Sequence, residues 1–182
     1  MTADTVGGVW TYALELCRAF VADGVRVELA TLGAPLSAAQ WVEARAVEGL
    51  TVHESSYQLE WMEEPWEDVR ASGEWLLGLE ARLAPDLIHL NGYCHGALPW
   101  RAPVLMVAHS CVLSWWEAVK GEPAPGRYAR YQQEVTRGLR AAARVVAPSE
   151  AMLAAAERHY GPLGSTHIIP NARRAEGFPP RG

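Results

Sequence analysis

Cysteine is scarce in this sequence, and its spacing matches no disulfide or zinc framework. Among 182 residues there are three, Cys17, Cys94 and Cys111. An odd number of widely spaced cysteines argues against a disulfide-stabilised secreted domain and favours a reducing compartment. We therefore expect a cytoplasmic protein.

Long hydrophobic runs and an excess of basic residues are also missing. No apolar stretch approaches the roughly 18 residues of a membrane span, and no signal peptide opens the chain. The net charge of −5 offers no electrostatic footprint for nucleic acid or anionic membrane. With 49% hydrophobic and 20% charged residues, the composition is that of one globular domain. We expect no nucleic-acid partner and no membrane span.

Two familiar phosphate-binding loops are absent as well, namely the P-loop and the G-x-G-x-x-G fingerprint. A glycine pair, Gly7-Gly8, stands instead directly before a helical pattern that Gly24 closes. Glycines without Cβ atoms, followed by a helix N-terminus, suit a phosphate or pyrophosphate. The alternative is a tight turn in which the glycines only adopt positive φ.

Behind this loop, strand and helix patterns alternate with short connections. Strands are predicted at residues 25–31, 50–53, 87–90, 103–108, 145–147 and 167–169. Helices are predicted at 9–20, 37–47, 65–83, 128–142 and 149–160. This alternation predicts a doubly wound, mostly parallel, Rossmann-like α/β sheet, whose ligands bind at the carboxyl ends of the strands.

The sequences of several segments resemble motifs of glycosyltransferase family 4. The stretch DTVGGVWTYA at residues 4–13 is similar to the first loop and helix of that family's N-terminal domain in enzymes of the two-domain GT-B architecture. Four later segments resemble its motifs in order: PDLIHLN at 85–91, VAHS at 107–110, VAPS at 146–149 and IIPN at 168–171. Ala172 replaces the glycine expected next. The resemblance covers nearly the whole chain and implies a single N-terminal half of a GT-B enzyme.

The resemblance implies a retaining, metal-independent sugar transfer from a sugar nucleotide to an acceptor that the sequence does not identify. Gly7 and Gly8 are expected to face the donor diphosphate, and His109 to contact the donor sugar as the catalytic residue. The alternative for His109 is a cap on the following helix. The remaining candidate substrate-binding residues are Asn91, Tyr93, Ser110, Trp115, Ser149 and Asn171.

No cofactor and no metal are expected. Cys94-His95 and His109-Ser110-Cys111 both follow predicted strands and could converge, but neither has the paired spacing of structural zinc. The indoles of Trp115 and Trp116 either line the acceptor side or pack as ordinary helix residues. Residues 60–67, acidic and rich in tryptophan, are expected to form a solvated loop.

Two departures from the family pattern shape our expectations. Only three residues precede the glycine loop region, so most of the central strand is expected to be missing. Either residues 1–5 pair as a stub, or another segment fills the gap. We assign residues 1–171 to the acceptor-side domain and 172–182 to a truncated interdomain linker, with the nucleotide-binding domain absent. The isolated chain is then expected to be inactive. Alternatives are a non-catalytic partner module, acting with a separately encoded C-terminal half or as a homo-oligomer, and an inactive remnant.

Overall fold

The structure, a computed structural model, describes residues 1–173. Its strands are β1 (Thr2–Asp4), β2 (Glu28–Leu32), β3 (Thr51–His53), β4 (Ile88–Leu90), β5 (Val104–Val107), β6 (Arg144–Ala147) and β7 (Thr166–Ile168). Its helices are α1 (Gly8–Ala22), α2 (Ala38–Arg45), α3 (Trp66–Leu83), α4 (Val112–Lys120), α5 (Ala129–Ala141) and α6 (Glu150–Tyr160), with the short 3-10 helices η1 (Cys94–Ala97) and η2 (Gly126–Tyr128). The part of the predicted linker at 174–182 lies outside the described residues.

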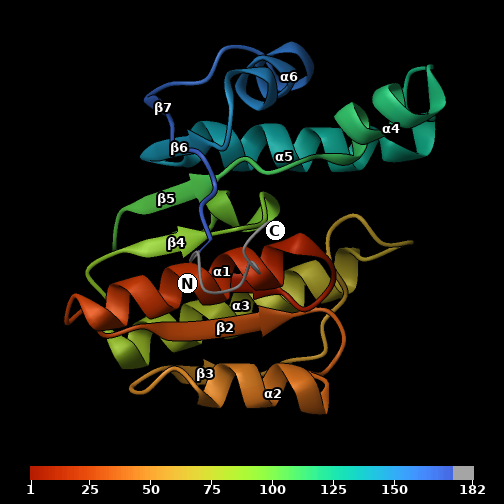
Figure 1. The fold of residues 1–182 in the computed structure, drawn as a ribbon. Helices are drawn as coiled ribbons and strands as arrows, with labels where there is room; N and C mark the ends of the chain where they lie inside the picture. Colours follow the sequence, from red (N-terminus) through yellow and green to blue (C-terminus); the bar gives the residue numbers. More distant parts are fainter. Residues whose placement is uncertain (174–182) are drawn as a thin grey trace.

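The strands form two parallel sheets that meet at the middle of the molecule. One sheet has the order β1-β2-β3 and the other β4-β5-β6-β7. Since β1 contacts β4, the strands run β3-β2-β1-β4-β5-β6-β7 across the molecule (Figure 1). The chain thus reverses its winding direction between β1 and β4, and the predicted doubly wound parallel fold is confirmed.

The stub predicted at the N-terminus is also confirmed. Thr2–Asp4 pair with Ala30, Thr31 and Leu32 of β2. Toward β4, side-chain hydrogen bonds replace a ladder among the described residues: the Asn91 backbone N–H donates to Thr2 Oγ1 (3.0 Å), and the Asn91 side-chain amide donates to the Thr2 carbonyl (2.8 Å). Asn91 therefore joins the two sheets where a longer strand was expected.

Successive residues of β2 show why helices cover both faces of the first sheet. Leu29 packs into one hydrophobic cluster with α1 residues such as Leu14, whereas Ala30 packs against Leu76 and Leu79 of α3. Side chains alternate between the faces of a strand, so one apolar strand serves two helical layers. Figure 1 shows α1 in front of the sheet and α3 behind it.

In the second sheet, α5 approaches the loop after β4 unusually closely. A Cβ atom on Gly138 of α5 would lie 1.9 Å from the Tyr93 carbonyl oxygen, and one on Gly96 would lie 2.5 Å from the Gly138 carbonyl oxygen. Only glycine allows this backbone contact. The contact fixes the position of Tyr93 and the 3-10 helix behind it.

No bounds were predicted from the sequence for η1, η2 or α4, although a helix after His109 was considered. Helix α4 begins at an unusual cap, because the Cys111 sulfur accepts the Ser114 N–H (3.3 Å) while the Ser114 hydroxyl accepts the Cys111 N–H (3.3 Å). Cysteine is not among the residues that signal a helix start. Within residues 1–173, no helix is long and apolar enough to cross a membrane.

Candidate active site

A cavity of about 470 Å³ opens where the two sheets meet, at the carboxyl ends of β1, β4 and β5. Its walls come from the loops that follow these three strands, from residues 58–61, and from aromatic residues of α4, η2 and α5. The switch point of a doubly wound sheet is where such folds bind ligands. The cavity brings together seven predicted site residues: Gly7, Gly8, Asn91, Tyr93, His109, Ser110 and Trp115.

The glycine loop presents backbone to this cavity. Gly7 has φ 75° and ψ −156°, a conformation open essentially to glycine alone, and Gly8 is the first residue of α1. In the described chain, no side chain caps the start of α1, and its first turn carries no acidic residue. Among residues 1–173, apart from the adjacent residues and the nearby backbone of α1, no atom lies within 4 Å of a Cβ placed on Gly7 or Gly8. The helix start therefore keeps free N–H groups and the positive end of the helix dipole beside open space.

His109 is held by a hydrogen-bonded chain that starts at the N-terminal stub. Its Nε2 lies 2.9 Å from Asn91 Oδ1, and the Asn91 amide nitrogen donates to the Thr2 carbonyl. Since this donation turns the amide oxygen toward His109, the network assigns the proton to Nε2. Nδ1 then carries the lone pair, and it has no hydrogen bond from any residue that the structure describes.

The surroundings keep this imidazole neutral. Burial lowers the pKa of His109 from 6.5 to about 4. Tyr12 of α1 packs against the ring edge-to-face, with centroids 4.6 Å apart. The alternative role as a helix cap does not fit, because the N-cap of α4 is Cys111. His109 is thus placed to accept a hydrogen bond from a ligand at neutral pH.

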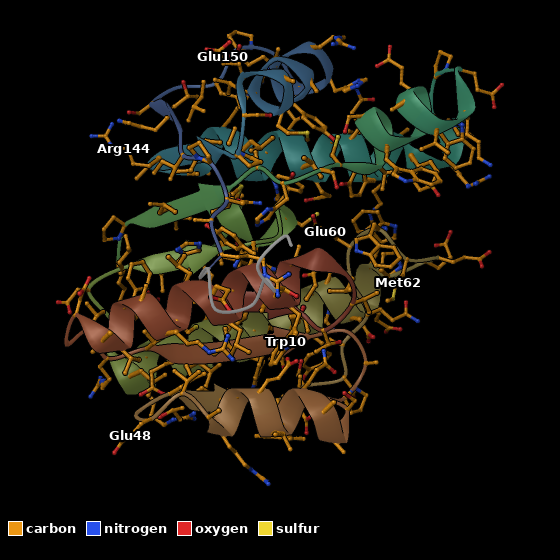
Figure 2. The ribbon with its side chains drawn as sticks, in the orientation of Figure 1. Trp10, Glu48, Glu60, Met62, Arg144 and Glu150 are labelled. Carbon is orange, nitrogen blue, oxygen red and sulfur yellow. The ribbon has the colours of Figure 1, made fainter. Side chains whose placement is uncertain are left out.

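Glu60 corrects the prediction of a solvated loop at residues 60–67. Its carboxylate accepts N–H groups from Tyr93 (3.0 Å to each oxygen) and Cys94 (2.7 Å), and it lines the cavity. Figure 2 shows Glu60 on the side of the sheet to which the strand arrows point. The Glu60 carboxylate caps the start of η1. Because the sequence did not predict η1, it gave no reason to expect a capping carboxylate at Glu60.

Asp4 also lines the cavity, directly before the glycine loop. Burial, with a smaller contribution from the Glu60 carboxylate, raises the pKa of Asp4 from 3.8 to about 7. Asp4 is the first residue of the segment that resembles the family's first loop, and no role was predicted for it. A carboxyl group at the end of a strand predicted to be central was the signal available in the sequence.

Aromatic side chains form the remaining wall. Trp61 and Trp115 are 41% and 48% exposed, and both line the cavity. Trp116 packs at 5.6 Å from Tyr128, and the Arg127 guanidinium lies over both of these rings at 5.2 and 5.0 Å. Trp116 thus packs against another aromatic ring, and both indoles line the cavity. The role of this wall on the acceptor side stays a prediction.

Two predicted substrate-binding residues lie apart from this site. Of the described residues that line the cavity, none is Ser149 or Asn171. Ser149 is the N-cap of α6, and its hydroxyl accepts the Met152 N–H at 3.2 Å. The family motif at 146–149 therefore coincides here with a helix start.

Cysteine and histidine side chains of the two segments that could have converged on a metal have other partners. Cys111 caps α4, and His95 Nε2 lies 3.0 Å from the Ser72 hydroxyl and 3.1 Å from the Val69 carbonyl oxygen. Within residues 1–173, no group of three or more His, Cys, Asp or Glu side chains could hold a metal ion.

Solved structures share this fold at low sequence identity. Sucrose-phosphate synthase from Thermosynechococcus elongatus aligns with a TM-score of 0.65 and 17% identity over 92% of this chain and 43% of its own. A shorter chain of that synthase aligns with a TM-score of 0.61 and 16% identity over 97% and 92%. UGT73P12 of Glycyrrhiza uralensis, complexed with glycyrrhetinic acid 3-O-monoglucuronide, gives a TM-score of 0.54 and 11% identity over 92% and 48%. The chain thus spans about half the length of the longer two.

The structural likeness identifies the fold as one half of the GT-B architecture. None of the curated proteins compared with the chain is significantly similar in sequence. The sequence model of Glycosyltransferase Family 4, however, matches residues 6–175, which include the glycine loop, the loops after β4 and β5, and the start of α6. The chain therefore belongs to Glycosyltransferase Family 4.

Proposed function

We propose that this domain is the acceptor-side half of a retaining, metal-independent glycosyltransferase that takes its sugar from a sugar nucleotide. The observation that carries the proposal is the meeting of Gly7-Gly8 and His109 in one cavity at the switch point of the sheet. A helix N-terminus and a fixed neutral imidazole are suited to the diphosphate and to the sugar of one donor.

The donor diphosphate lies against the N–H groups at the start of α1. As the glycosidic bond breaks, negative charge grows on the leaving diphosphate, and preorganised N–H groups stabilise it without a cation. The absence of a Cβ atom at Gly7 and Gly8 lets the phosphate oxygens approach the backbone. The lack of acidic residues in the first turn of α1 avoids repulsion.

His109 positions the donor sugar. Its Nδ1 accepts a hydrogen bond from a sugar hydroxyl, while Asn91 holds the ring through Nε2. A second, nucleotide-binding domain holds the nucleoside and most of the diphosphate. On this proposal the chain on its own does not transfer sugar, since it offers half of the donor site.

The test is a reconstitution with a family C-terminal domain, supplied as a separate polypeptide, in the presence of a chelator. We expect no transfer by either half and sugar transfer by the mixture, with the anomeric configuration of the donor kept in the product, as read by NMR. Turnover by the purified chain alone contradicts the half-site proposal. Loss of turnover with the chelator, restored by a divalent cation, contradicts metal independence.

A matched glycine variant makes the reconstitution specific to the donor loop. Gly8→Ala introduces a methyl group that meets no atom of residues 1–173 within 4 Å, so the fold should tolerate it. We expect the KM for the sugar nucleotide to rise at least tenfold, about 1.4 kcal/mol, because the methyl group occupies the phosphate's space. Gly78→Ala, an open helical site far from the loop in sequence, is the control.

A further inference from the structure

The charges around the cavity point to the kind of acceptor it takes, an inference that rests on the proposed function. Asp4 and Glu60 both line the cavity, and none of the lining residues, all within the described chain, is Lys or Arg. On the proposed function, the donor diphosphate is met by the backbone N–H groups at the start of α1. A phosphate on the acceptor would instead meet two carboxyl groups and no cation on the cavity walls. Such a group is recognised elsewhere by Arg or Lys.

The two carboxyl groups are not equivalent. Glu60 spends its oxygens on the Tyr93 and Cys94 N–H groups, so its negative charge is built into the fold. No described side chain forms an ion pair with Asp4. Burial, and to a lesser extent the neighbouring Glu60 carboxylate, opposes the ionisation of Asp4 and raises its pKa to about 7. A positive group on a ligand would supply the missing countercharge.

The aromatic wall suits the same ligand. Trp61 and Trp115 line the cavity with partly exposed indoles. Indole faces bind both the C–H surfaces of sugars and cationic groups. Arg127 already lies over Trp116 and Tyr128, so this wall accommodates a cation.

We propose that the cavity binds an acceptor that carries a protonated amine beside its hydroxyl groups and carries no phosphate, with Asp4 as the ion-pair partner and the indoles of Trp61 and Trp115 as the stacking surface. Amino sugars and aminocyclitols are the chemical class that fits. Arg127 favours the opposite class of acceptor, because its guanidinium lies over the Trp116 ring of this wall and would attract an anion.

The test measures direct binding of three probes to the chain, namely glucosamine, glucose and glucose 6-phosphate, by ligand-observed NMR titration at neutral pH. Glucosamine is expected to bind at least tenfold more tightly than glucose 6-phosphate, with glucose between them. In Asp4→Asn, glucosamine should fall to the affinity of glucose while glucose is unchanged, which a merely structural role for Asp4 would not produce. Glu63→Gln, an exposed carboxylate of the same segment as Glu60, is the control and should leave all three affinities unchanged.

Three results overturn the proposal: tighter binding of glucose 6-phosphate than of glucosamine, especially if Arg127→Ala removes it; an equal loss of glucosamine and glucose in Asp4→Asn; or no binding of any probe at millimolar concentration. The outcome is separable from that of the reconstitution. If the chain binds the amine but the reconstituted mixture never transfers sugar, only the proposed function is contradicted. If the reconstituted enzyme transfers sugar but prefers a phosphorylated acceptor, only the proposed acceptor class is contradicted.

Discussion

The two halves of the sheet contribute different chemistry to the same cavity. The half with β1, β2 and β3 supplies backbone groups, through Gly7 and Gly8, and two carboxyl groups, Asp4 and, from the segment after β3, Glu60. The half with β4 to β7 supplies side chains on its loops, above all Asn91 and His109. A backbone site depends on local conformation, whereas a side-chain site depends on packing that holds each rotamer. Substitutions in the first half should therefore impair the site by placing atoms in the space of the ligand. Substitutions in the second half should impair it by removing the packing that holds the side chains in position.

The junction between the halves explains why the cavity lies there. Among the described residues, β1 and β4 share no ladder, and Asn91 bridges them through Thr2. The same Asn91 also orients His109. One residue thus closes the gap in the sheet and positions a candidate ligand-binding group, so stability and function are coupled at this point.

The largest expected effect tests the support of the second half. Gly138→Ala places a Cβ atom 1.9 Å from the Tyr93 carbonyl oxygen, and backbone cannot move aside cheaply. We expect the free energy of unfolding to fall by about 3 kcal/mol or more, measured by urea denaturation.

Gly78→Ala is the control for this variant. A Cβ on Gly78 of α3 meets no atom of the described chain within 4 Å, so alanine should stabilise the helix by about 0.5–1 kcal/mol. Equal effects of the two substitutions would contradict the close contact between α5 and η1.

The next effect concerns the Asp4 carboxyl group of the first half. The pKa of Asp4 is raised from 3.8 to about 7, so the native state holds a proton that the unfolded state releases between these values. Stability from this group is fully present below about pH 4 and is lost as the pH rises through about 7, with an upper limit of about 4 kcal/mol.

Asp4→Asn removes this titration. Its unfolding free energy should match the wild type near pH 4 and exceed it by about 1–4 kcal/mol at pH 8, as chemical denaturation at a series of pH values will show. The neutral histidines His89 and His109, each with a pKa lowered to about 4, titrate in both proteins and cancel in the difference. A difference independent of pH would mean that Asp4 ionises normally.

The sequence could predict the architecture because its signals were local. Ser37 and Gln40 form the predicted capping box, and α2 begins at Ala38. The strands were predicted to within about three residues, the largest error being at β2, where residues 25–27 precede the strand. Resemblance placed His109 and the glycine loop in one site, and the cavity contains both.

The missed features depend on contacts between distant segments. Glu60 meets the N–H groups of Tyr93 and Cys94 across 33 and 34 residues of sequence. Nothing near Glu60 in the sequence distinguishes it from the exposed Glu63 and Glu64. Asp4 gains its raised pKa from burial and, to a lesser extent, from the nearby Glu60 carboxylate, and both arise only in the folded protein. Such tertiary pairing has no local pattern.

Gly7 tests the backbone conformation of the glycine loop in the first half of the sheet. Its φ of 75° with ψ of −156° strains any residue with a Cβ atom, so Gly7→Ala should cost about 1–3 kcal/mol of stability. Gly8→Ala, one residue on, should leave the melting temperature nearly unchanged. Comparable thermal shifts for the two variants would argue that the loop conformation is different from the one described.

His109→Ala tests the second half through activity. In the reconstituted enzyme we expect turnover to fall by more than tenfold, about 1.4 kcal/mol in the barrier, with little change in melting temperature. If the variant melts the domain while the folded fraction keeps its specific activity, the histidine is structural. Because its pKa is lowered to about 4, His109 itself should add no titration to the pH profile of kcat between about 5 and 7.

The smallest expected effect concerns Ser149, for which the family resemblance and the structure predict different roles. The family motif suggested a substrate contact, whereas the hydroxyl caps α6 by accepting the Met152 N–H. Ser149→Ala should therefore lower the unfolding free energy by about 1 kcal/mol and leave the KM for the sugar nucleotide unchanged. Ser37→Ala removes the corresponding cap of α2 in the first half and should cost a similar amount. If Ser149→Ala instead raises this KM tenfold while Ser37→Ala does not, the serine faces the donor in the assembled enzyme, and the cavity extends toward α6 when the second domain is present.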